Sequence, residues 1–223
     1  MLNILLAVVL IIPLNAFAFS TVYHKLFAHR AFKPKTWVPY IGSVIGVLLL
    51  LPSPKTFAGL HRMHHKYSDT ELDPHTPLYG KRYTLFPTFF VNKKLQKVPP
   101  YIYKNITKDI ERDYPTLSKL TERMTFFFVA FFNLFLYFLN FDAFVVSILI
   151  LFISVNLHGY ANTFFHKPMP DGTAEIVDIP WGAKFISPEF NHATHHNKAS
   201  SSDFGNSDAK DWMEPIIRKF LSK

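Results

Sequence analysis

Two short stretches of this sequence share one pattern. HRMHH at residues 61–65 and HATHH at residues 192–196 each place a histidine three positions before a histidine pair. Residues three and four positions apart lie on one face of an α-helix, so the three imidazoles of each stretch can converge. Imidazole binds zinc, copper, iron and nickel, and does not suit magnesium or calcium. The repeated pattern therefore predicts a transition-metal site built on helices.

Further histidines are grouped elsewhere in the chain. HKLFAH at residues 24–29 holds two, and NTFFH at residues 162–166 holds one, four positions after an asparagine. His24 and His29 are about 140° apart around an ideal α-helix, so they are expected to serve two adjacent metals unless one extends past the helix end. Nine grouped histidines exceed the four ligands of a tetrahedral zinc. They suit two metal ions with four or five nitrogens each.

The expected site differs from the carboxylate di-metal sites of soluble helix bundles. Those sites use two Glu-x-x-His pairs with further glutamates, and this chain has a single such pair, Glu189 with His192. The sequence also contains no cysteine. This excludes disulfides, thiolate zinc sites, iron–sulfur clusters and cysteine nucleophiles.

Charged and apolar residues alternate in long blocks along the 223 residues. Residues 1–20 contain no charged side chain and residues 124–157 contain only Asp142, whereas residues 21–123 hold 17 Lys and Arg against 7 Asp and Glu. With 49% hydrophobic and 17% aromatic residues, the chain is not disordered. The formal charge of the chain is +8, and most of its Lys and Arg lie between the apolar blocks. This distribution is typical of a membrane protein and not of a nucleic-acid binder.

Three membrane crossings are expected. Residues 1–23 are long enough for a transmembrane helix. The alternative, a cleaved signal peptide, is suggested by small residues at 16–18 but lacks the usual preceding Lys or Arg. Residues 124–160 are too long for one crossing and predict a transmembrane hairpin that turns at residues 140–142. This turn has no Lys or Arg, as expected of a loop outside the cytoplasm.

The other segments are expected at the membrane surface or in the cytoplasm. Prolines shorten residues 36–54 to an interfacial or re-entrant helix. Residues 66–123 predict a polar cytoplasmic cap, in which residues 107–123 form one charged surface helix, and residues 161–223 predict a cytoplasmic C-terminal part. The expected fold over residues 1–223 is a single all-α integral membrane domain. It has about three transmembrane helices, an interfacial helix and a cytoplasmic helical cap that holds a histidine-rich di-metal site.

The histidines place the expected site at the cytoplasmic surface of the membrane. His24 and His29 directly follow the first apolar block, and His166 follows the last. A shared site requires His29 and His61 on the same side, so residues 36–54 cannot cross the bilayer once. The expected location is a bacterial inner membrane or the endoplasmic reticulum, with the active site facing the cytoplasm.

The sequence around these histidines resembles the membrane-bound fatty acid desaturases, in particular the delta-9 acyl desaturases. Four stretches carry the resemblance in the family's order: HKLFAHR (24–30), HRMHHKYSDTELDPH (61–75), NTFFH (162–166) and HATHH (192–196). Three features depart from the family pattern. One apolar span precedes the first stretch where the family usually has two, Leu60 stands where animal relatives carry Asp, and Ala193 replaces the Asn of the last stretch.

The resemblance implies a di-iron centre that uses O2 and two external electrons to remove two hydrogens from a fatty acyl chain. In such a centre Asn162 would hold a metal-bound water. His75 and His158 remain as candidates for a substrate contact or for support of a metal ligand. The alternatives are that His75 is a loop residue without a role and that His158 forms a hydrogen bond with a neighbouring helix. The implied metal ligands are His24, His29, His61, His64, His65, His166, His192, His195 and His196.

The expected function is therefore an O2-dependent di-iron desaturase, delta-9-like by resemblance. A hydroxylase on the same histidine framework is the alternative. A histidine-rich metal transporter is disfavoured, because transport sites lie near the bilayer midplane and often use carboxylates.

The expected partners follow from what the chain lacks and from its charge. It has no Gly-rich dinucleotide fingerprint, so a separate electron donor is expected, by resemblance a ferredoxin or cytochrome b5. The carrier of the fatty acyl substrate stays open between coenzyme A, a carrier protein and a lipid. Basic residues of the cap are expected to attract an anionic group or anionic bilayer lipids: Lys81, Arg82, Lys93, Lys94 and Lys97. No nucleic-acid partner is expected.

Overall fold

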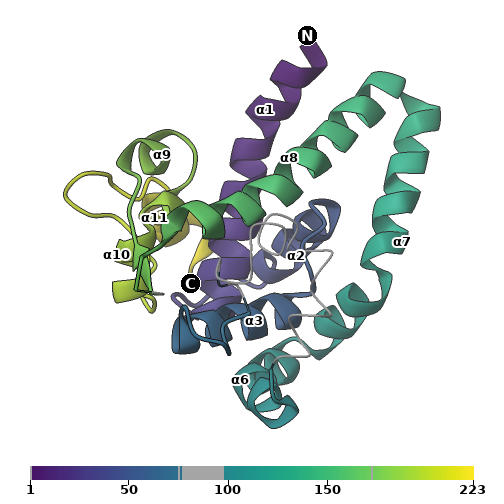
Figure 1. The fold of residues 1–223 in the computed structure, drawn as a ribbon. Coiled ribbons are helices and arrows are strands. Elements are labelled where there is room, and N and C mark those ends of the chain that lie inside the picture. The colour runs from purple at the N-terminus through teal and green to yellow at the C-terminus, as the bar shows by residue number, and fades with distance from the viewer. Residues whose placement is uncertain (1, 75, 77–97, 172) are drawn as a thin grey trace.

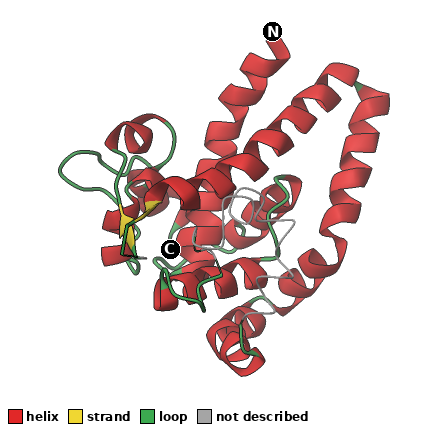
Figure 2. Cartoon of the chain, in the orientation of Figure 1, coloured by secondary structure: helices red, strands yellow, loops and turns green. Residues whose placement is uncertain are grey.

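The computed structural model describes residues 2–74, 76, 98–171 and 173–223, and these are mostly helical (Figures 1 and 2). The helices are α1 (Leu2–Leu14), η1 (Asn15–Ala28), α2 (Val38–Leu48), α3 (Pro54–Tyr67), α6 (Pro100–Asp113), α7 (Pro115–Leu139), α8 (Phe141–Phe165), α9 (Pro180–Phe185), η3 (Pro188–Phe190), α10 (His192–Asn197), α11 (Glu214–Ile216) and η4 (Ile217–Leu221). Two short antiparallel strands, β1 (His166–Pro168) and β2 (Ala174–Ile176), pair His166 with Ile176. The five basic cap residues named above lie outside the described residues.

α1 and η1 form one continuous helix, which is 27 residues long and apolar enough to cross a membrane. It extends five residues beyond the helix expected over residues 1–23, so His24 lies within it. From Asn15 onward the helix is wound as a π-helix, in which each N–H bonds to the carbonyl five residues back. The N–H of His29 accordingly donates to the carbonyl of His24 at 3.1 Å.

α7 and α8 form the long hairpin expected over residues 124–160, with longer helices on both sides of the turn (Figure 1). The turn is at Asn140, whose side chain accepts a hydrogen bond from the N–H of Ala143 at 2.9 Å and so begins α8. Among the described residues, a second segment is long and apolar enough to cross a membrane only if Pro115–Thr121 and Thr125–Leu139 are counted as one bent span. The three crossings therefore stay a prediction.

The charged helix expected over residues 107–123 is divided in the structure. α6 ends at Asp113, and α7 begins at Pro115 after Tyr114 takes a non-helical conformation. A proline disfavours helical geometry in the residue before it and is well placed at the first position of a new helix. The break turns α7 into the hairpin and leaves α6 beside α3, the helix of His61, His64 and His65, which it contacts.

Residues 36–54 form α2 and a return. α2 has 11 residues, and the chain then reverses through Leu50, which has a φ of 58°, before Ser53 caps α3. α2 packs closely on η1: a Cβ at Gly42 would lie 2.4 Å from Val22, and one at Gly46 would lie 2.3 Å from Tyr23. Glycine is required where the two helices approach this closely.

Candidate metal centre

Nine imidazoles from four segments of the chain converge into two adjacent groups, each of which could hold a metal ion. In each group the ligand atoms lie within 4.8 Å of one another. The five-histidine group consists of His24, His29, His61, His65 and His195, and the four-histidine group consists of His64, His166, His192 and His196. These are the nine histidines singled out by sequence. His75 lies outside the described residues, as do the side chains of His158 and Asn162.

Each H-x-x-H-H stretch is divided between the two groups, whereas the sequence pattern had suggested one shared point. On α3, His61 and His65 belong to the five-histidine group and His64 to the four-histidine group. On α10 the division is reversed, since His192 and His196 enter the four-histidine group and His195 enters the other. Residues four apart thus serve one group, and the residue between them reaches the other.

The winding of η1 explains why His24 and His29 serve the same group. An ideal α-helix would separate them by about 140°. In a π-helix, residues five apart lie about one turn above one another, and their ring centres are 4.9 Å apart. Of the two expected arrangements, the one with separate metals is wrong, and the alternative, one histidine past the helix end, is confirmed, since η1 ends at Ala28 and His29 follows it.

The spacing of the ring nitrogens favours ligands at right angles. In the five-histidine group, Nε2–Nε2 distances are 3.1 Å for His24 and His195, 3.0 Å for His29 and His61, and 2.8 Å for His65 and His195. With metal–nitrogen bonds of about 2.0–2.1 Å, ligands 90° apart are separated by about 2.9 Å and tetrahedral ligands by about 3.3 Å.

Carboxylates contact the second nitrogen of three rings, one of them in the five-histidine group. Glu189 contacts Nδ1 of His24 and accepts a hydrogen bond from Ser20 at 2.5 Å. In the four-histidine group, Nδ1 of His64 is 2.9 Å from Asp73 and Nδ1 of His166 is 3.0 Å from Asp69. A carboxylate that accepts the Nδ1 proton leaves the Nε2 lone pair for a metal and fixes the orientation of the ring.

These three carboxylates were not predicted as part of the site. Glu189 stands in the single Glu-x-x-His pair, and Asp69 and Asp73 both lie in the second family-like stretch, so all three carried a sequence signal. Asp69 sits at a positive φ of 58°, which sequence alone does not reveal. Burial acts to raise the pKa of Asp69, but the hydrogen bond and charge of His166 outweigh it and lower that pKa.

Six of the nine imidazoles are held neutral by their surroundings. Burial, followed by the charge of neighbouring histidines, lowers the pKa of His29 to about 2. The same causes, in the same order, lower the pKa values of His61, His65, His192, His195 and His196. Rings that stay unprotonated at neutral pH are ready to coordinate a metal without first losing a proton.

An apolar cavity of about 380 Å³ adjoins the histidines. Glu189 and Phe165 line it together with residues of α8, α9 and η1. The ring of Phe165 stacks on His192 at 4.7 Å, and Phe19, also in the wall, lies 6.1 Å from His24. The cavity can therefore hold an aliphatic chain beside both groups.

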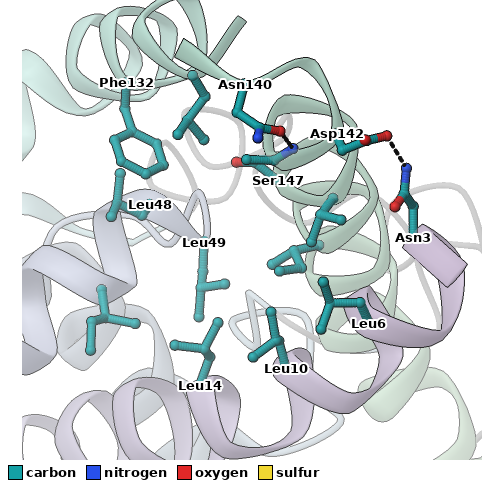
Figure 3. A pocket seen from close by; sticks show the side chains of 15 residues that line it. Asn3, Leu6, Leu10, Leu14, Leu48, Leu49, Phe132, Asn140, Asp142 and Ser147 are labelled. Atoms are coloured by element: carbon teal, nitrogen blue, oxygen red, sulfur yellow. Dashed lines mark hydrogen bonds between the residues drawn. The ribbon is translucent and has the colours of Figure 1, made fainter.

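A larger apolar cavity of about 510 Å³ lies elsewhere, among α1, α2, α7 and α8 (Figure 3). At one end, Asn3 donates a hydrogen bond to Asp142 at 2.9 Å. None of the nine histidines lines it. Its position in the helical hairpin makes it a poorer candidate than the smaller cavity for chemistry at the metal groups.

The fold and site define a class: a helical protein with an apolar N-terminal helix and two adjoining histidine groups that could bind metal. Comparison with known families matches residues 2–219 to the fatty acid desaturase family, and the chain belongs to that family.

Individual relatives are similar over shorter stretches. Delta-9 acyl-lipid desaturase 1 of Arabidopsis thaliana is 28% identical over 120 residues, which is 52% of this chain and 37% of that protein. The sn-1 stearoyl-lipid 9-desaturase of Synechocystis sp. is 43% identical over 53 residues, 24% of this chain and 17% of that protein. Acyl-CoA C20 Delta5-desaturase of Anemone leveillei is 36% identical over 66 residues, which is 30% of this chain and 21% of that protein. The chain thus matches well under two thirds of each relative's length.

Proposed function

We propose that this chain is a membrane-bound, O2-dependent desaturase that introduces a double bond into a fatty acyl chain and holds one iron ion in each histidine group. The observation that carries the proposal is the convergence of nine imidazoles into two adjoining groups. Family membership supports desaturation of fatty acyl chains. The delta-9 position is proposed because two of the similar relatives are named as 9-desaturases.

Iron fits the donor set of both groups. Imidazole is a good ligand for iron, and nitrogen spacings near 2.9 Å suit a coordination sphere larger than the tetrahedron of structural zinc. Two iron ions bound there would supply the O2 activation that attack on an unactivated carbon chain requires. Asn162 is proposed to hold a metal-bound water, and His75 and His158 to contact substrate or support a ligand.

The substrate is proposed to enter the cavity lined by Phe165 and Glu189. Its walls are mostly aromatic and aliphatic, with Asn15, Ser187 and Glu189 as the polar residues, so an acyl chain would be held mainly by apolar contacts. The rings of Phe19 and Phe165 then fix how closely the chain approaches the two groups. Glu189, Asp73 and Asp69 keep the histidine rings in place during turnover.

The overall reaction balances with an external reductant. Two C–H bonds of adjacent methylenes break, O2 takes four electrons, two from the chain and two from the donor, and two water molecules form with two protons from solvent. The donor is proposed to be a ferredoxin or cytochrome b5 type protein. We propose that Leu2–Ala28 crosses the bilayer with the histidine groups at its cytoplasmic surface.

Expression in a host that lacks unsaturated lipids tests this function. Mass spectrometry of the fatty acids should reveal a new double bond with the full chain. That double bond should disappear when His61, His64, His192 or His195 is replaced by alanine, and should persist with Lys104→Gln, an exposed residue on α6. A hydroxylated product would refute desaturation in favour of oxygen insertion. Full activity in two or more of the histidine variants would refute the metal assignment.

A further inference from the structure

The C-terminal residues lie along the segment that follows the first long helix. The N–H of Lys35 donates to the carbonyl of Leu221 at 2.8 Å, and the N–H of Lys223 donates to the carbonyl of Lys33 at 2.9 Å. Pro34 and Ser222 form an isolated antiparallel bridge between these bonds. Two segments nearly two hundred positions apart in sequence thus share one surface.

This surface carries basic side chains on both segments. Lys33, Lys35, Arg218, Lys219 and Lys223 are its basic residues. Residues 30–41 contain no acidic residue and residues 212–223 contain one, Glu214, whose carboxylate is 3.7 Å from Arg218. The surface therefore has a net positive charge that its own contacts do not neutralise. We call these five residues the basic patch.

The terminal helix has two apolar sides. Ile217 and Leu221 are buried in the main core of the described residues, which is enough to hold the helix in place. Ile216 and Phe220, four positions apart, nevertheless remain 40% and 54% exposed. Exposed apolar side chains beside Arg218 and Lys219 form the pattern of a helix that lies on a membrane surface.

The position of the patch along the long helix matches the boundary of a bilayer. Residues 33–37 follow the end of η1 after four intervening residues, and the ring of Trp37 stacks on Phe17 of that helix at 6.2 Å. Trp37 is 46% exposed and Tyr40 is 52% exposed. Tryptophan and tyrosine favour the level of the lipid headgroups, and nearby lysines can extend their amines to that level.

We propose that the basic patch binds the headgroups of anionic phospholipids while Ile216 and Phe220 contact the acyl region beside Trp37. The proposal rests on the membrane placement put forward under the proposed function. The cation cluster supplies the charge complementary to a phosphodiester, and the neighbouring exposed apolar side chains distinguish a lipid from a free anion. Binding there would hold the C-terminal segment, and the residues that pack on the five-histidine group, against the membrane.

The test uses the purified full chain in detergent with an equimolar mixture of phosphatidylglycerol and phosphatidylcholine. Native mass spectrometry counts the molecules of each lipid retained per chain. The patch variant combines Lys33→Gln, Lys35→Gln, Arg218→Gln and Lys219→Gln. The control variant removes four exposed charges elsewhere: Lys104→Gln, Lys108→Gln, Lys119→Gln and Lys198→Gln.

We expect the unaltered chain to retain phosphatidylglycerol in preference to phosphatidylcholine. The patch variant should lower this preference about tenfold, and the control variant should leave it unchanged. Equal loss in both variants, no loss in the patch variant, or displacement of the lipid by inorganic phosphate at equal concentration would overturn the proposal. Fatty acid products are measured in the same variants. If no chain gives a product while the lipid preferences come out as expected, the desaturase function is refuted and the patch is not.

Discussion

Lys25 and Asp211 form an ion pair whose two side chains are both fully buried. The pair joins the helix that carries His24 to the C-terminal segment. Lys25 also donates to the carbonyl of Ser202 at 3.0 Å and lies 4.4 Å from the ring centre of Phe204. That ring is 4.5 Å from His195, so the ion pair holds an apolar wall against the five-histidine group.

Replacing Lys25 by methionine should destabilise the protein strongly. Asp211 would keep a buried charge without its cation, although it still accepts hydrogen bonds from the N–H groups of Phe204 and Met213. Loss of one partner of a buried ion pair costs about 3–5 kcal/mol. The thermal unfolding midpoint of the detergent-solubilised chain should fall accordingly.

The double variant Lys25→Met with Asp211→Asn is the matched control. It removes both charges and keeps one oxygen that can accept the hydrogen bonds of Met213 and Glu214, which Asp211 receives at Oδ1, and it gives up the bond from Phe204 to Oδ2. Its midpoint should lie well above that of Lys25→Met alone. If the two midpoints coincide, the unpaired charge is not the cause of the instability.

The three carboxylates behind the histidines should control metal affinity group by group. Glu189→Gln weakens the support of His24, so it should lower the affinity of the five-histidine group, whereas Asp73→Asn should act on the four-histidine group through His64. Loss of such a partner lowers metal affinity by about 10–100-fold. Iron content after dialysis against graded chelator should fall by one equivalent in each variant. Simultaneous loss of both equivalents would contradict separate support of the groups.

Stability of the metal-free chain should fall as the pH is lowered below about 6.5. In the unfolded chain histidines take up a proton near that pH, but burial lowers the pKa of His29 to about 2 in the folded chain. His61, His192 and His195 shift in the same direction. The unfolded state thus binds more protons, and each such histidine costs about 1.4 kcal/mol per pH unit below 6.5. Unfolding midpoints of chelator-treated protein at pH 7.5, 6.5 and 5.5 measure the slope; a flat series would contradict buried neutral rings.

The sequence predicted which histidines gather, but not how they are shared. Spacing in α3 and α10 identified the ligand candidates, because residues three and four apart lie close on any α-helix. The assignment to two groups depends on how the two helices face each other, which only the tertiary structure supplies. The sequence left two arrangements open for His24 and His29, and it did not predict the π-winding of η1 that brings them into one group.

Helix boundaries can be predicted where the local chemistry of one residue sets them. Asn140 predicted the turn of the hairpin correctly, because its side chain caps α8. The division between α6 and α7 also has a local cause, because Pro115 disfavours helical geometry at Tyr114. The charge pattern of residues 107–123 does not reveal it. The pairing of Asp69 with His166 was beyond prediction, since the two residues are 97 positions apart in sequence.

Arg62 fastens α3 to the end of η1 and should be sensitive even to a conservative change. Its Nη2 donates to the carbonyl of Phe27 at 2.6 Å and to Asp109 at 2.9 Å, and its Nε donates to the carbonyl of Ala28 at 2.6 Å. These bonds fix the last turn before His29 relative to His61. A lysine keeps the charge but has no planar fork to serve both carbonyls and the carboxylate.

Arg62→Lys should therefore lower the free energy of unfolding by about 2–3 kcal/mol, the value of a lost hydrogen bond to a charged group with its unsatisfied partners. Arg30→Lys is the control, because Arg30 also pairs with Asp109 but is half-exposed, where such pairs contribute about 0–1 kcal/mol. Thermal unfolding and iron content of the two variants give the comparison. Equal effects of the two changes would mean that the loss comes from the pairing with Asp109, which both arginines share. The contacts of Arg62 with η1 would then carry no stability of their own.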